Sequence, residues 1–169
     1  MAKILQFSRG GGKYMITIFD VANYFIKKSN NEEENTMTPL KLQKLCYYAQ
    51  AWSLVWDDKP LFKDEFQAWV HGPANYSLFK KYDVGRNSTI QEVDCGFRLR
   101  IFNEEQLETL NAVWEAYGKF TGKYLEQLTH QEDPWKKTRG TLPPGMGSNR
   151  VIKKNLMKEY YLKEYGEES

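Results

Sequence analysis

Cysteine and histidine are scarce in this chain of 169 residues, which contains two of each. Cys46 lies in a strongly apolar segment and Cys95 stands before a glycine in a connecting segment, so we expect no disulfide and a reducing compartment. Neither the cysteines nor His71 and His130 have the Cys-x-x-Cys or His-x-x-x-His spacing of a zinc site. We therefore expect no bound metal ion.

Charge of one sign is not in excess either, and long apolar runs are missing. The chain carries 24 basic and 22 acidic residues, which leave a net charge of +2. Proteins that bind a phosphate backbone concentrate positive charge on one surface, so we do not expect nucleic acid as a partner. No run reaches the roughly 18 apolar residues that a bilayer-spanning helix needs. We expect a cytoplasmic protein that has no membrane partner.

Motifs that bind phosphate or dinucleotides are incomplete. Gly12 and Lys13 resemble the end of a Walker loop, but the glycine required five positions before Gly12 is missing. Gly145 and Gly147 begin a dinucleotide fingerprint, but Arg150 occupies the third glycine position. We expect no cofactor.

The chain does have ample apolar surface. Hydrophobic residues make up 41% of it and aromatic residues 15%, which is enough to form the core of one domain. We expect this domain to span residues 15–165, with a flexible arm at 1–14 and a short tail at 166–169. Met15 is an alternative to Met1 as the first residue.

The clearest predicted element is a helix over Thr38–Trp56. The hydroxyl of Thr38 can cap its first turn, and Pro39 suits the first helical position because its missing N–H would be unpaired there. Beyond the first two turns only Gln50 and Ser53 are polar, so the apolar surface extends around most of the helix. We expect this helix to be buried at the centre of the domain and the binding surface to lie elsewhere.

Caps and apolar periodicities predict five more helices and two short strands. The helices begin after Thr17 (Ile18–Ser29), at Pro73 (to Tyr82), after Asn103 (to Gly118), after Thr121 and after Ser148. The last of them is expected to bury Val151, Ile152, Asn155, Leu156 and Tyr160. Alternating apolar residues predict strands at Phe66–Val70 and Phe97–Ile101, which can pair. The predicted fold is mainly α (α+β), a single-domain helical bundle around a buried central helix with a small antiparallel sheet.

Two aromatic corners are candidate functional segments, one at Trp69–Pro73 with Tyr76 and Phe79 and one at His130–Trp135. A structural interpretation explains both, because Gly-Pro makes a fixed corner, a carboxylate can cap a helix, and large rings usually fill a core. The alternative is a partner-binding surface, because exposed tryptophan and tyrosine dominate interface energies. The candidate residues are Trp69, His71, Gly72, Pro73, Tyr76, His130, Asp133 and Trp135.

Five separated blocks of the chain resemble one known family. They are Pro39–Leu45 with Tyr47–Gln50, Pro60–Phe62, Phe66–Pro73, Val113-Trp114 with Tyr117-Gly118, and Leu128–Trp135. Together they resemble the Panacea domain family, a phage-associated group that includes the GepA-like and SocA-like proteins. The resemblance covers Ile18–Tyr161.

The resemblance implies a bacterial or prophage antitoxin that neutralises a protein toxin by direct binding, with the toxin encoded by an adjacent gene. Some relatives are adaptors that deliver a toxin to a AAA+ protease, which is the first alternative. An enzyme that uses His71 or His130 is the second alternative. No nucleophile elbow or carboxylate pair accompanies these histidines, and the family supplies no catalytic residues, so we predict no enzyme activity. The candidate residues are carried over as signature positions.

Overall fold

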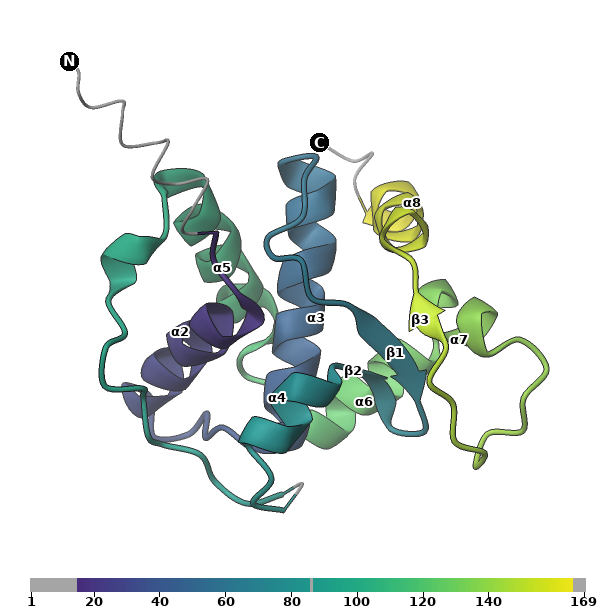
Figure 1. Cartoon of the computed structure of the whole chain (residues 1–169), viewed down its shortest axis with the longest axis horizontal. Coiled ribbons are helices and arrows are strands. Elements are labelled where there is room, and N and C mark those ends of the chain that lie inside the picture. Colours follow the sequence, from purple (N-terminus) through teal and green to yellow (C-terminus); the bar gives the residue numbers. More distant parts are fainter. Residues whose placement is uncertain (1–14, 86, 166–169) are drawn as a thin grey trace.

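The computed structural model describes residues 15–85 and 87–165 (Figure 1). Within these ranges the chain forms seven α-helices, one 3₁₀-helix and a three-stranded sheet, which confirms the predicted mainly α fold. In chain order the elements are α2 (Ile18–Asn30), α3 (Pro39–Trp56), β1 (Phe66–Trp69), β2 (Gly72–Ala74), α4 (Tyr76–Lys81), η1 (Leu99–Ile101), α5 (Glu104–Tyr117), α6 (Gly122–His130), α7 (Asp133–Arg139), β3 (Val151–Ile152) and α8 (Lys154–Tyr165). The arm predicted at 1–14 and the tail predicted at 166–169 lie outside the described residues.

Helix α3 is the centre of the domain, as predicted. The side chain of Thr38 caps its first turn by accepting a hydrogen bond from the Lys41 amide at 3.2 Å. Every residue from Leu40 to Leu54 is buried, and helices α2, α5, α6 and α8 pack against α3. Figure 1 shows α3 upright in the middle of the molecule, with α2 and α5 on one side and β3 and α8 on the other. Trp56, at the end of the helix, is 49% exposed.

Three further helix starts agree with the sequence. Thr17 and Asn103 both form capping boxes, in which the cap side chain and the third helical residue bond each other's backbone amides. Thr121 accepts a hydrogen bond from the amide of Tyr124 at 3.1 Å. These starts are predictable because a cap is decided by residues three or four positions apart.

The sheet differs from the prediction in its strands. Its order is β2-β1-β3 with both pairs antiparallel, so Ala68 faces Pro73 and Gln67 faces Val151. Strand β1 lies where the sequence predicts it, but the second strand predicted at Phe97–Ile101 is wrong, because Leu99–Ile101 forms η1. The side chains of Leu99 and Ile101 are 41% and 39% exposed. Their alternation therefore does not mark the buried face of a sheet.

The prediction that Pro73 opens a helix is also wrong. Pro73 lies in β2, an edge strand, where its missing N–H removes no ladder hydrogen bond. Helix α4 begins later, at Tyr76, because the side chain of Asn75 accepts a hydrogen bond from the Leu78 amide at 2.8 Å.

The prediction for the last helix has the wrong register. Val151 and Ile152 form β3, and α8 begins at Lys154. The helix buries Met157 and Tyr161, whereas Asn155 is exposed. Val151 and Ile152 are apolar because they belong to the sheet. Counting them as helical residues assigned the wrong face of α8 to the core.

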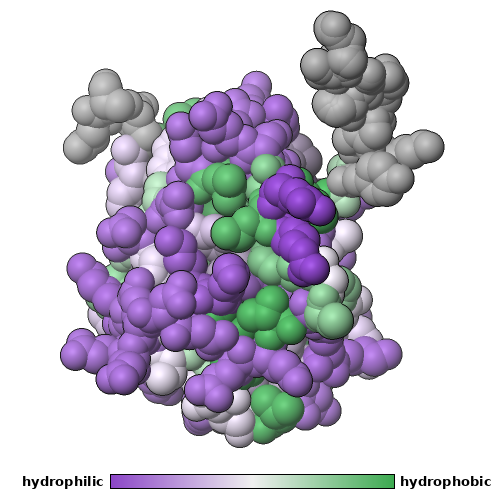
Figure 2. All heavy atoms as spheres, turned by 90° about the vertical axis from the view of Figure 1, so that its left-hand side faces the viewer, coloured by the Kyte–Doolittle hydropathy of each residue, from purple (hydrophilic) through white to green (hydrophobic). Residues whose placement is uncertain are grey.

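The outer surface is mostly hydrophilic on the side that carries α2 and α5, with an apolar patch in its middle (Figure 2). A cavity of about 550 Å³ lies between α2 and residues 94–101, and Phe19, Phe97 and Arg98 are among its lining residues. None of the helices within 15–85 and 87–165 combines the length and the apolarity that crossing a membrane requires.

Candidate functional site

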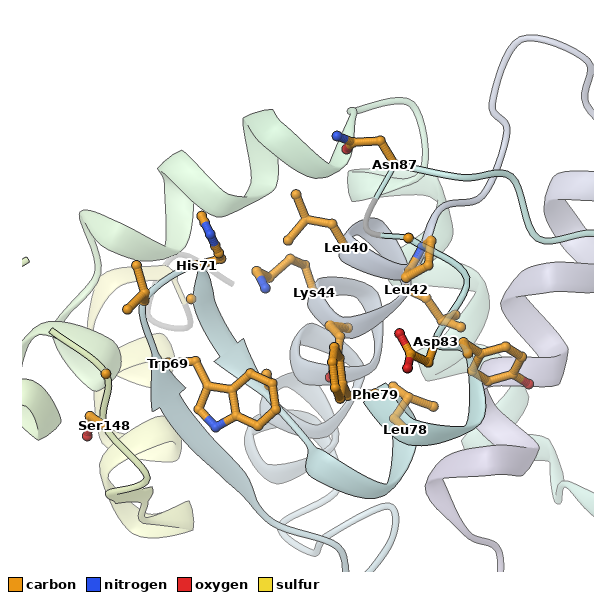
Figure 3. A pocket seen from close by; sticks show the side chains of 18 residues that line it. Leu40, Leu42, Lys44, Trp69, His71, Leu78, Phe79, Asp83, Asn87 and Ser148 are labelled. Atoms are coloured by element: carbon orange, nitrogen blue, oxygen red, sulfur yellow. The ribbon is translucent and has the colours of Figure 1, made fainter. Parts of the chain in front are cut away.

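The larger cavity, of about 660 Å³, lies where the first turns of α3 meet the β1–β2 hairpin and α4 (Figure 3). Its volume falls in the range of about 300–1,000 Å³ that is typical of ligand pockets. Leu40, Gln43 and Lys44 of α3 form part of its lining. The sequence suggested a wholly internal α3, but the beginning of this helix faces a cavity.

Trp69 and Phe79 line this cavity, and Tyr76 contacts Phe79 from outside it; we call these three side chains the aromatic rim. The ring centroids of Trp69 and Phe79 are 5.5 Å apart in an edge-to-face contact, and those of Tyr76 and Phe79 are 6.4 Å apart. Tyr76 is 56% exposed and Phe79 is 45% exposed. Large rings that remain this accessible are the side chains that contribute most to protein interfaces.

The rim is held in place by polar contacts beneath it. The side-chain amide of Gln43 donates to the Asn75 carbonyl at 2.9 Å and accepts from the Asn75 amide at 2.8 Å. The side chain of Asn75 also donates to the Glu65 carbonyl at 2.8 Å. Because Gln43 belongs to α3, these bonds attach the start of α4 to the core.

Lys44 is a buried amine in the cavity wall. It is 1% exposed, and its Nζ donates to the carbonyl of Pro73 at 3.2 Å. Burial disfavours the charged form and lowers the pKa of Lys44 to about 7, while the negative charge of Glu126 acts in the opposite direction. The amine therefore exists in both protonation states near neutral pH.

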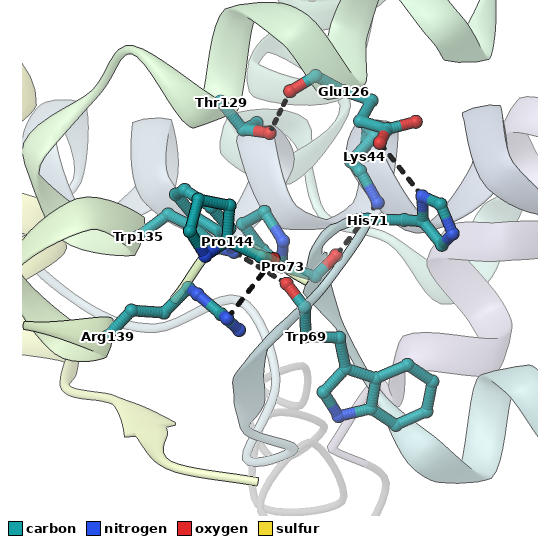
Figure 4. Close-up of polar contacts among 9 residues, drawn as sticks. All are labelled: Lys44, Trp69, His71, Pro73, Glu126, Thr129, Trp135, Arg139 and Pro144. Carbon is teal, nitrogen blue, oxygen red and sulfur yellow. Dashed lines mark hydrogen bonds and ion pairs between the residues drawn. The ribbon is translucent and has the colours of Figure 1, made fainter. Parts of the chain in front are cut away.

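His71 lies in the turn of the hairpin, beside Lys44 (Figure 4), and Gly72 follows it as the first residue of β2. Nδ1 of His71 lies 2.9 Å from a carboxylate oxygen of Glu126 on α6. Gly72 has a φ of +103°, and a Cβ atom there would lie 2.7 Å from Cε of Lys44 and 2.9 Å from the hydroxyl of Thr129. This position requires glycine for both reasons, and here the hairpin packs closely against α3 and α6.

The second aromatic corner lies behind the hairpin and not at the cavity. The rings of His130 and Trp135 are stacked with centroids 4.0 Å apart, and Trp135 is 8% exposed. The indole N–H of Trp135 donates to the carbonyl of Trp69 at 2.7 Å. Burial lowers the pKa of His130, and its Nε2 has no hydrogen-bond partner among the described residues. Asp133, in the first turn of α7, pairs with Lys137 at 3.6 Å.

Arg139 extends this packed layer. One guanidinium nitrogen donates to the carbonyl of Ala68 in β1 at 3.0 Å, and another donates to the carbonyl of Pro143 at 2.9 Å. The guanidinium also lies 5.1 Å from the Trp135 ring centroid. The second corner therefore supports the sheet from behind.

The candidate residues thus divide into two groups. Trp69, His71 and Gly72 line the cavity, the Pro73 carbonyl bonds the lysine in its wall, and Tyr76 stands on the rim. His130, Asp133 and Trp135 belong to the layer behind.

Sequence reasoning missed Lys44 and Glu126 as site residues, whereas it grouped Phe79 with Trp69 and Tyr76 in the first aromatic corner. One signal was present: Lys41 and Lys44 interrupt a helix that is otherwise strongly apolar. Their burial depends on helices from distant parts of the chain, which local spacing does not show. No group of three or more histidine, cysteine, aspartate or glutamate side chains is placed to hold a metal ion in the part of the chain that the structure describes.

Comparison with protein families identifies the domain. A family model described as the Antitoxin SocA-like, Panacea domain matches residues 42–136. The matched region contains Lys44, the aromatic rim and the second corner, and leaves out β3 and α8. Neither the search of curated proteins nor the search of solved structures returned a match. Because the matched region is more than half of the chain, this chain belongs to the Panacea domain family, which is described as antitoxin SocA-like.

Proposed function

We propose that this chain is the antitoxin of a bacterial or prophage toxin–antitoxin pair and neutralises a toxin, encoded by an adjacent gene, through direct binding. The observation that carries the proposal is the aromatic rim. Tyr76 and Phe79 remain about half exposed on a short helix that Gln43 fixes to the core. An anchored aromatic surface loses little conformational entropy when it binds, which favours tight association.

The rim is a better candidate surface than the second corner. Trp135 is buried and uses its indole N–H on the Trp69 carbonyl, and the ring of His130 is stacked on it. A partner reaches the ring of Trp135 only after the residues around it rearrange. The rim needs no such rearrangement, because its rings already face solvent beside a cavity.

Co-expression with the product of the adjacent gene tests the proposal. We expect that product to stop growth when expressed alone, and the full chain to restore growth and to co-purify with it. Replacing Tyr76 and Phe79 together by serine should weaken binding by roughly 30-fold or more, the scale of interface hot spots, and should abolish the rescue. Tyr124→Ser is the matched control, because Tyr124 is also 47% exposed and stacked, on Phe120, but lies away from the cavity.

Other outcomes would favour the alternatives. A harmless neighbouring product, or one that stays toxic beside this chain, contradicts an antitoxin. If the half-life of the partner shortens only in cells that contain a AAA+ protease, the chain is an adaptor. If His71→Gln abolishes rescue while the complex and its thermal stability persist, an enzymatic role replaces the binding role.

A further inference from the structure

The two ends of the large cavity differ in chemistry (Figure 3). Lys44 and His71 stand at one end, and the exposed Asp83 stands at the other. The wall between them is mainly apolar and includes Leu40, Leu42, Leu78 and Phe79. A ligand that matches this distribution has an apolar body with a negative group at the end that meets Lys44.

Lys44 has spare capacity to bind such a negative group. An ammonium group carries three hydrogens, and the acceptor found for it among the described residues is the Pro73 carbonyl. The nearby carboxylate of Glu126 is instead in contact with His71, at 2.9 Å (Figure 4). A buried cation that lacks acceptors is costly, and a carboxylate that enters the cavity would supply both an acceptor and a countercharge.

We propose that the cavity binds a segment of the partner protein that presents an apolar side chain next to a carboxylate, with the carboxylate on Lys44. This inference rests on the proposed function, because it names the part of the toxin that the antitoxin recognises. Asp83 repels a carboxylate and so sets the direction of the segment. The aromatic rim favours a protein over a free small molecule, because Tyr76 lies outside the cavity and a ligand confined within it would leave this ring uncovered.

Binding of a carboxylate is coupled to a proton. The pKa of Lys44 is about 7 in the free protein, and a bound carboxylate raises it. At pH 8 the complex should therefore take up about one proton, and its affinity should fall roughly tenfold per pH unit above that. The charged groups that face Lys44 are Glu126 and His130 on α6 and His71 on the hairpin, with Asp83 across the cavity.

Calorimetry of the full chain with its purified toxin, at pH 8 in two buffers of different ionisation enthalpy, measures this uptake. We expect about one proton for the wild type, and no uptake with at least tenfold weaker binding for Lys44→Met. Lys41→Met is the matched control: Lys41 is also buried in α3, but its Nζ donates to the Gly118 carbonyl at 2.6 Å and lies outside the cavity lining. If the wild type takes up no proton, or if both variants lose the uptake equally, the inference is wrong.

A second measurement uses the wild-type chain alone, so it needs no toxin and does not depend on the folding of a variant. N-acetyltryptophan and N-acetyltryptophanamide share an apolar ring and differ in the carboxylate. At millimolar concentrations the acid should shift NMR signals of residues that line the cavity, while the amide should not. Equal binding of the two probes, or no binding of the acid, would overturn the inference. Rescue of growth by Lys44→Met at wild-type level would do the same, while leaving the proposed antitoxin function intact.

Discussion

The two aromatic corners use the same residue types for different purposes. Trp69 and Trp135 each have a histidine nearby in the sequence, His71 and His130. Trp69 contributes its ring to an accessible rim, whereas Trp135 is covered and bonds the backbone of Trp69 from behind. An aromatic signature of one family can therefore combine an accessible surface with the layer that supports it.

The largest expected effect is a difference in the free energy of unfolding between variants of the two corners. Trp135→Ala should lower the free energy of unfolding by about 3–5 kcal/mol, because a buried ring, its hydrogen bond to Trp69 and its contact with Arg139 are all lost. Tyr76→Ala should change it by less than about 0.5 kcal/mol, as for other exposed positions. Urea unfolding followed by circular dichroism measures both. Equal losses would show that the two corners do not differ in this way.

A smaller effect concerns the buried carboxyl group of Glu132, within the second corner. Glu132 is buried and accepts hydrogen bonds from the hydroxyls of Tyr48 and Tyr161, at 2.9 and 2.6 Å. Burial raises the pKa of Glu132 from 4.5 to about 7. Between these values the folded state holds a proton that the unfolded state has released, so this group's contribution to stability falls as pH rises from 4.5 to 7 and is constant above.

Glu132→Gln should remove this pH dependence. The variant should be more stable than the wild type at pH 8, by up to about 3 kcal/mol, and the difference should shrink towards pH 4.5. Thermal melts of both proteins across this pH range measure the difference in stability. Burial lowers the pKa of His130, which gives the opposite pH dependence, but His130 is present in both proteins and its contribution cancels in the difference. A difference that is constant with pH would show that Glu132 stays ionised in the fold.

The smallest effect in this series tests the contact of the first corner with α3 and α6. Gly72→Ala should destabilise the protein by about 2 kcal/mol, because Gly72 has a positive φ and a Cβ there would collide with Lys44 and Thr129. Gly96→Ala is the control, since a Cβ there meets no atom within 4 Å. Denaturant titration of the two variants gives the comparison, and equal stabilities would contradict the close packing of the hairpin on α6.

The sequence predicts those features that depend on neighbours along the chain. The caps at Thr17, Thr38 and Asn103 were predictable because each needs a side chain and an amide only three residues apart. Strand β3 was not, because two residues carry too little pattern and their partners in β1 are more than eighty positions away. The aromatic residues of the site were visible as signature positions, but Lys44 was not, because its burial results from how the hairpin and α6 close over α3.

The bonds around β2 also restrict how another chain can approach. The Pro73 carbonyl is occupied by Lys44, Pro73 has no N–H, and both backbone groups of Asn75 are paired with Gln43. The Gln43 side chain of α3 bonds both the N–H and the carbonyl of Asn75, as a residue of a neighbouring strand would do. The outer edge of β2 is therefore covered by α3 at this point. An extended segment of a partner therefore cannot add itself to this edge, and the same closure protects the sheet from edge-to-edge aggregation. Recognition on this side must depend on side chains and not on shared backbone hydrogen bonds.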